Sequence, residues 1–201
     1  MSEETKPEQI PTEEEEKTEE KTEEKTEEKT EEPPAKKQKV IDEGYTMNIN
    51  LAVDKGFETK SLTEISESPV ACLQGISDRG GEILEKYKVK TVADLANWKF
   101  ARWCEAIDDL ADQEEDGCRA EGSMMNLNKA LDKEYETKPL KEIKDAPLAS
   151  VQGLSDAAVE YLDSLTPKVD TISKLGDWKY YKWAKSISTL AAVENADFSS
   201  R

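Results

Sequence analysis

Apolar residues recur at helical spacing along residues 95–111 and again along residues 175–191. At 100° per residue, six apolar side chains of each stretch fall on one face of a helix. These are Phe100, Trp103, Cys104, Ile107, Leu110 and Ala111 in the first stretch, and Tyr180, Trp183, Ala184, Ile187, Leu190 and Ala191 in the second. We therefore predict two amphipathic helices whose apolar faces, with Trp103 and Trp183 as interior anchors, lie in a core.

The beginnings of these two helices also carry a pattern. Asn97 and Asp177 are good side-chain acceptors for the free amides of a first helical turn, so we predict them as N-caps. Trp98 and Trp178 then occupy the first helical position and point away from the apolar face. They lie beside a set of cations that share this side of the helices. The cations are Arg102 in the first helix and Lys182 and Lys185 in the second.

Shorter helices are indicated by capping residues that precede the first long helix. Ser61 with Glu64 forms a capping box, Ser77 caps a helix over residues 78–87, and Thr91 with Asp94 opens another helix through residue 96. No window alternates apolar and polar residues over five positions with β-branched enrichment, so no strand is predicted. The predicted fold class is all-α.

The chain contains an internal duplication. Residues 47–62 align without a gap with residues 125–140, and the register continues through PVACLQGISD and PLASVQGLSD. Two inserted residues near Thr166 change the offset from 78 to 80, which aligns the two long helices. We predict two tandem helical repeats of about 70 residues, each with only a modest core of its own, so that they can pack on each other. The predicted boundaries are residues 45–118 for the first repeat, 119–123 for a linker and 124–201 for the second.

Residues 1–44 differ from the rest in composition. Residues 1–34 hold fifteen Glu and five Lys and almost nothing apolar, in a chain whose net charge is −17. Such a segment buries too little surface to offset chain entropy, and we predict a disordered acidic tail. Lys36, Lys37 and Lys39 follow it. They either pair with the acidic tail or act as a nuclear-import signal, since the stretch resembles known monopartite signals.

Residues 73–96 and their counterparts resemble the helix-hairpin-helix family over about 25 residues of each repeat. The first hairpin glycine of the family pattern is kept as Gly75 and Gly153, each followed by an apolar residue. The closing stretch is kept in both repeats, as Thr91, Val92 and Leu95 and as Thr171, Ile172 and Leu175. The resemblance implies sequence-independent DNA binding, in which hairpin amides and a helix N-terminus meet a phosphate.

The second hairpin glycine of that family is replaced by Ser77 and Ser155, each followed by an aspartate. A capping serine occupies the amides that a phosphate needs, and the aspartate adds negative charge at the same place. Residues 45–122 hold sixteen acids against nine bases, which is a poor charge balance for nucleic acid, whereas residues 124–201 hold twelve against eleven. The second repeat also gathers aromatic and basic residues that could stack bases and follow a backbone. They are Trp178, Lys179, Tyr181, Lys182 and Lys185.

Several classes of function are disfavoured by what the sequence lacks. It contains no His and only three Cys, without a CxxC pair, so we expect small buried thiols in a reducing compartment and neither a metal site nor a cofactor. Ser and Cys have no His to activate them, and we expect no enzymatic activity. There is no apolar run of eighteen residues and no signal-peptide-like stretch, which predicts an intracellular protein with no membrane partner, and the lysine stretch makes the nucleus a candidate location.

The sequence is therefore interpreted as a non-enzymatic binding or scaffold protein with duplicated helical modules and a protein partner. The predicted contact surface comprises Trp98, Arg102, Trp178, Lys179, Tyr181, Lys182 and Lys185. The alternative is sequence-independent nucleic-acid binding through the two hairpins and the basic, aromatic helix of the second repeat.

Overall fold

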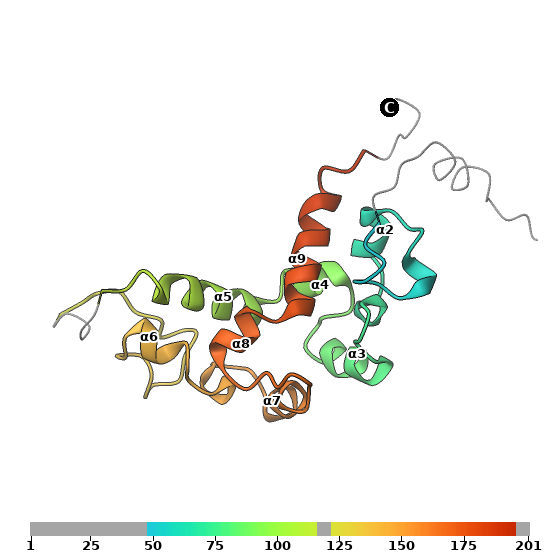
Figure 1. Cartoon of the computed structure of the whole chain (residues 1–201). Helices are drawn as coiled ribbons and strands as arrows, with labels where there is room; N and C mark the ends of the chain where they lie inside the picture. The colour runs from blue at the N-terminus through green and yellow to red at the C-terminus, as the bar shows by residue number, and fades with distance from the viewer. Residues whose placement is uncertain (1–47, 116–121, 196–201) are drawn as a thin grey trace, which may run out of the picture.

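The computed structural model describes residues 48–115 and 122–195, called here the first and second halves, and they consist of helices joined by turns (Figure 1). The predicted acidic tail and the lysine stretch at residues 36–39 lie outside the described residues. The described elements are, in order, η1 Lys55–Phe57, α2 Leu62–Ser66, η2 Val70–Cys72, α3 Asp78–Glu85, α4 Val92–Ala96, α5 Lys99–Ala111, α6 Leu140–Ile143, η3 Leu148–Ser150, α7 Asp156–Asp163, α8 Ile172–Gly176 and α9 Lys179–Ala191. Extended pairing over these residues is limited to isolated bridges, which confirms the all-α class.

Local capping explains where the short helices begin. Ser61 with Glu64 and Thr91 with Asp94 form the two expected capping boxes, at the starts of α2 and α4. Ser77 accepts a hydrogen bond from the Gly80 amide at the start of α3, also as expected. In each case a side-chain oxygen satisfies an amide that has no partner within its helix.

The predicted caps of the long helices are wrong. Asn97 lies at the C-terminal end of α4, where its side-chain amide donates to the Ala93 carbonyl, and Asp177 lies at the equivalent end of α8. The short helices run directly up to these residues, so Trp98 and Trp178 take the N-cap positions of α5 and α9 without making a side-chain cap bond.

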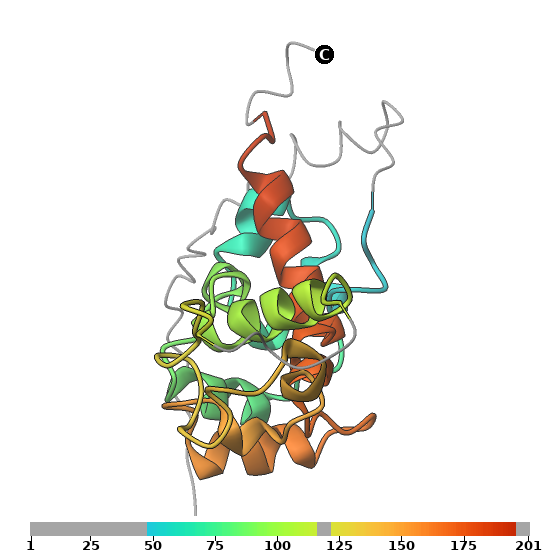
Figure 2. The ribbon, with the colours of Figure 1, turned by 90° about the vertical axis from the view of Figure 1, so that its left-hand side faces the viewer.

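The two long helices are exchanged between the halves. Helix α5 of the first half packs against α8 and α6 of the second, and α9 packs against α4 and α2 of the first. Figure 2 shows the same interlocked arrangement from the side. The contact between α8 and α5 is so close that a Cβ on Gly176 would lie 2.7 Å from the Glu105 backbone nitrogen. The core is therefore built from both halves together, and the predicted repeat boundaries cut across it.

Hydrogen bonds at the ends of the exchanged helices follow the same pattern. Glu194, beyond α9, accepts hydrogen bonds from the backbone amides of Leu62 and Thr63 in α2, at 2.9 and 2.8 Å. Glu114, beyond α5, accepts from the amides of Leu140 and Lys141 in α6, both at 3.0 Å. Glu114 and Glu194 are equivalent positions in the sequence alignment. Each long helix thus ends by capping a short helix of the opposite half.

The tryptophans reverse their expected roles. Trp98 and Trp178 are both only 5% exposed, whereas Trp103 and Trp183 are half-buried. The reason is that residues 98 and 178 precede the helices and have extended backbone, so the 100° rotation per residue does not describe where their side chains point. Leu110 and Leu190, expected on the core faces, are 59% and 50% exposed, in the last turn of each helix.

Candidate binding groove

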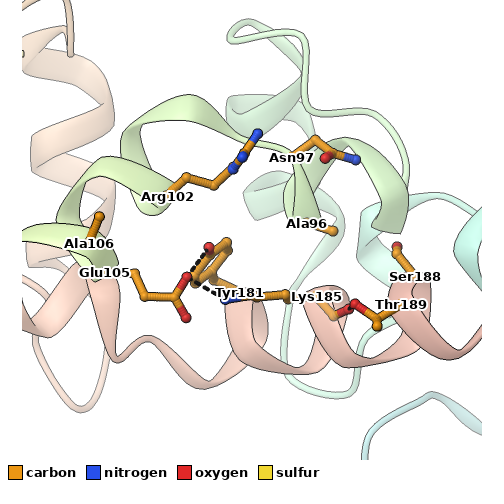
Figure 3. A pocket seen from close by; sticks show the side chains of 9 residues that line it. All are labelled: Ala96, Asn97, Arg102, Glu105, Ala106, Tyr181, Lys185, Ser188 and Thr189. Atoms are coloured by element: carbon orange, nitrogen blue, oxygen red, sulfur yellow. Dashed lines mark hydrogen bonds and ion pairs between the residues drawn. The ribbon is translucent and has the colours of Figure 1, made fainter. Parts of the chain in front are cut away.

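A groove lies where α9 crosses the junction of α4 and α5 (Figure 3). Its volume is about 470 Å³. Both halves contribute, because α4 and α5 come from the first and α9 from the second. The lining residues are Ala96, Asn97, Arg102, Glu105, Ala106, Tyr181, Lys185, Ser188 and Thr189.

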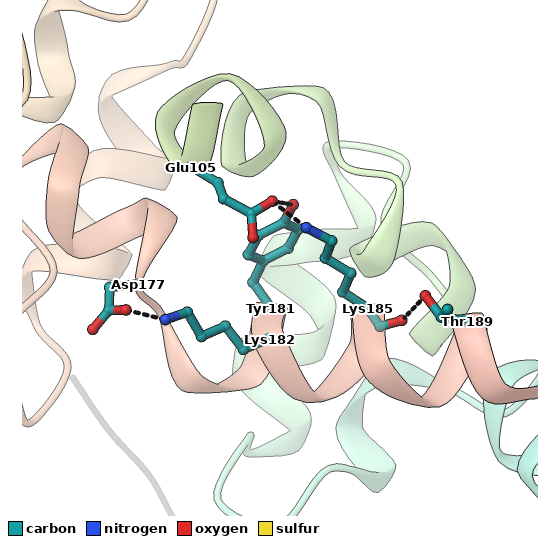
Figure 4. Close-up of polar contacts among 6 residues, drawn as sticks. All are labelled: Glu105, Asp177, Tyr181, Lys182, Lys185 and Thr189. Carbon is teal, nitrogen blue, oxygen red and sulfur yellow. Dashed lines mark hydrogen bonds and ion pairs between the residues drawn. The ribbon is translucent and has the colours of Figure 1, made fainter. Parts of the chain in front are cut away.

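Glu105 is the polar centre of the groove wall. Its carboxylate accepts hydrogen bonds from the Tyr181 hydroxyl at 2.7 Å and from the Lys185 ammonium at 2.6 Å (Figure 4). Burial acts to raise the pKa of Glu105, but the hydrogen bonds from Lys185 and Tyr181 outweigh it and the pKa is lowered. Burial and the neighbouring Glu105 raise the pKa of Tyr181. The wall is therefore a fixed network of a carboxylate, a neutral phenol and an ammonium.

Arg102 differs from the other cations of the groove. It is exposed, and within residues 48–115 and 122–195 its guanidinium makes no hydrogen bond or ion pair. The equivalent residue of α9, Lys182, forms an ion pair with Asp177, whereas the first half has Asn97 at that place. The replacement of an aspartate by an asparagine thus leaves Arg102 without the partner that its counterpart has.

The predicted contact surface is brought together only in part. Arg102 and Lys185 face the groove, and Lys182 lies on the neighbouring face of α9 against Asp177 (Figure 4). Trp98 and Trp178 are buried, so their prediction as exposed contact residues is wrong. Tyr181 is fully buried, and it reaches the groove only as part of the floor and through its hydrogen bond to Glu105.

Lys179 lies elsewhere, at the start of α9. Its ammonium is over the rings of Tyr180 and Trp183, at 4.6 and 5.3 Å from their centroids. Lys99 makes the same two contacts with Phe100 and Trp103 in α5. Each lysine covers one buried ring, of Tyr180 or Phe100, and one half-buried ring, of Trp183 or Trp103, so both lysines have a structural role in their own helices.

The hairpin residues show that the two halves are not alike. Gly75 and Gly153 both have positive φ, of 105° and 84°, as tight turns require. The Tyr180 hydroxyl occupies the place of a Cβ on Gly75, and the Phe100 ring lies 3.8 Å from that place on Gly153. Ser77 caps its helix with its hydroxyl, and Ser155 also occupies the N-cap position of α7, but it makes no side-chain cap bond there. The Ser155 hydroxyl is instead hydrogen-bonded to the Tyr87 hydroxyl of the first half.

Metal-ligating and nucleophilic side chains are not gathered in the described regions. No three His, Cys, Asp or Glu side chains are placed there to hold a metal ion. Cys72 and Cys104 are free and buried, and burial is the first cause that raises their pKa values to about 11 and about 12. None of the helices described is long and apolar enough to cross a membrane.

Sequence reasoning missed Glu105, Ser188 and Thr189 as groove residues. A signal was available in the alignment of the repeats, which pairs Glu105 with Lys185, two opposite charges at equivalent positions. The structure places these two residues in contact, where identical charges would repel each other. No protein-family model, curated protein or solved structure matches this chain.

Proposed function

We propose that this chain is a non-enzymatic binding protein, and that the groove between α4, α5 and α9 is where it binds a protein partner. The observation that supports this most is a convergence of polar groups in one hollow made by both halves. Arg102, whose guanidinium has no hydrogen bond or ion pair within the described residues, lies there with the network of Glu105, Tyr181 and Lys185. In this proposal the tandem repeats act as one interlocked body with one site, rather than as two separate modules.

Blocking the groove without changing its charge tests the proposal. Ala106 is an exposed groove residue, and the alignment pairs it with Ser186, which is exposed on α9 outside the groove lining. Ala106→Trp fills the groove, and Ser186→Trp adds the same side chain at the matched position. Both full-length variants are tagged, expressed in the source cell and compared by quantitative mass spectrometry of the proteins they capture. We expect a set of proteins to be lost with Ala106→Trp and retained with Ser186→Trp. Equal capture by the two variants would refute a binding role for the groove.

Nucleic-acid association is the second candidate function, and the exposed hairpin turns favour it. The hydroxyl of Tyr180 beside Gly75, the cap at Ser77 and the pairing of Lys182 with Asp177 weigh against it. Titration of the full chain with duplex and single-stranded DNA at increasing salt decides between the two. Absence of binding at low salt would eliminate this candidate, and a steep salt dependence abolished by replacing Lys179, Lys182 and Lys185 would establish it.

The location of the protein is part of the proposal. We propose that it acts inside the cell and that Lys36, Lys37 and Lys39 direct it to the nucleus. The triple substitution of these lysines by Ala in a fluorescent fusion is expected to move the protein out of the nucleus. An unchanged distribution would leave the lysines with the role of pairing with the acidic segment.

A further inference from the structure

Each groove residue can be compared with the residue that the alignment pairs with it in the other repeat. Three groove residues are uncharged where their counterparts are acidic: Asn97 against Asp177, Ser188 against Asp108, and Thr189 against Asp109. The groove therefore holds two cations, Arg102 and Lys185, and one carboxylate, Glu105. The counterpart set holds two cations and four carboxylates.

The counterpart cation, Lys182, forms an ion pair with one of those carboxylates, Asp177. The pKa of Lys182 is raised first by its hydrogen bond to Asp177, and also by the nearby carboxylates of Glu105 and Asp109. Arg102 has no such partner within the described residues, and Lys185 is already bound to Glu105. Lys182 is thus paired with Asp177, whereas Arg102 makes no hydrogen bond or ion pair within the described residues of a chain whose net charge is −17.

The other polar groups of the groove are already engaged. Asn97 donates to the Ala93 carbonyl, Thr189 donates to the Lys185 carbonyl, and Ser188 shares a hydrogen bond with Ser66. Among the described residues, Arg102 is therefore the charged donor of the groove that has no hydrogen-bond or ion-pair partner, and its planar guanidinium matches the two oxygens of a carboxylate. Binding of a nucleic-acid backbone requires several cations in a row. Glu105 also repels a doubly charged phosphate more strongly than it repels a singly charged carboxylate.

From this comparison we infer that the groove binds a protein segment through an Asp or Glu side chain, whose carboxylate pairs with Arg102 while the rest of the segment lies over Ala96 and Ala106. The inference rests on the proposed function, since it names the chemistry of the partner for the same groove. Charge complementarity selects the occupant: an acidic side chain restores at Arg102 the ion pair that Lys182 makes within the chain.

The test uses the full-length protein labelled with nitrogen-15 and three short peptides. The peptides are acetyl-Ala-Ala-Glu-Ala-Ala-amide, its Gln twin and its phosphoserine twin, and the readout is the side-chain Nε–Hε resonance of Arg102. We expect a saturable shift with the Glu peptide and at least a tenfold weaker response with the Gln peptide. Arg102→Gln is expected to abolish the response of the groove amides, whereas Lys182→Gln, the matched variant at the neutralised position, is expected to preserve it.

Four outcomes would overturn the inference: no saturable shift, an equal response to the Glu and Gln peptides, an equal loss in the two variants, or tighter binding of the phosphoserine peptide. A fifth outcome would overturn the choice of an external partner. If replacing Glu13–Glu16 by Gln moves the Arg102 resonance before any peptide is added, the chain's own amino-terminal segment occupies the groove and an external partner is not needed. If Ala106→Trp loses captured proteins but Arg102→Gln does not, the proposed binding function of the groove stands. Only the inference that a carboxylate pairs with Arg102 is then refuted.

Discussion

The close contact between α8 and α5 allows a test of the exchanged arrangement with one methyl group. Gly176→Ala places a Cβ 2.7 Å from the Glu105 nitrogen and 2.8 Å from the Cys104 carbonyl carbon. Ordinary contact begins at 3.4 Å, so the methyl group is about 0.7 Å too close to backbone atoms that cannot rotate away. Overpacking of this kind costs about 1–3 kcal/mol, which exceeds the gain of about 0.5–1 kcal/mol that Ala gives over Gly in a helix.

We therefore expect Gly176→Ala to lower the free energy of unfolding by about 1–2 kcal/mol, where an unobstructed helix would gain stability. Urea unfolding followed by circular dichroism measures this difference, and thermal unfolding should show a Tm lower by about 2–4 °C per kcal/mol. Gly56→Ala is the matched control, because nothing lies within 4 Å of its Cβ position. A Gly176→Ala variant as stable as the wild type, or more stable, would show that α5 does not lie against α8 in this way.

Three further predictions follow from the same contacts. Burial acts to raise the pKa of Glu194, but hydrogen bonds from the amides of Thr63 and Leu62 lower it below the ordinary 4.5, so its stabilisation is present above pH 4.5 and is lost as the pH falls through the lowered value. Glu194→Gln should lower the free energy of unfolding, measured with urea at pH 7, by about 0.5–2 kcal/mol. This difference should shrink below pH 4.5, and a constant difference would contradict the role of the carboxylate. Fragments 1–118 and 119–201 should each lack a stable fold and combine one to one in sedimentation experiments, since each long helix packs on the other fragment; folded monomeric fragments would disprove the exchange. Cys72 and Cys104 should react with a thiol reagent at pH 7.5 only after denaturant is added, and rapid reaction in the folded protein would show that they are not buried as described.

Sequence reasoning succeeded where the information is local. The capping boxes at Ser61 and Thr91 involve residues three positions apart, and the helical class follows from spacing within single helices. The partner of each long helix is not local information. An apolar face predicts that a helix is buried but not which half covers it, so the contact of Gly176 with Glu105 could not be derived from periodicity.

The errors at the tryptophans have a related cause. The prediction begins the helix one residue too early, at Trp98, whose backbone is extended, so the helical rotation wrongly turns this buried side chain outward. Of the groove residues, the sequence predicted only Arg102, Tyr181 and Lys185 as contact residues. Its walls come from elements about eighty residues apart, and the one trace of their contact in the sequence is the opposite charge of Glu105 and Lys185.

The exchange of helices also ties the proposed binding to the assembly of the fold. Arg102 and Glu105 come from α5, which is anchored on the second half, while Tyr181 and Lys185 come from α9, which is anchored on the first. Neither half alone contains the groove, so a ligand that binds there stabilises the interlocked state over any opened one. A substitution outside the groove lining, such as Gly176→Ala, should therefore weaken binding in proportion to the population it opens, and added ligand should restore part of the lost stability.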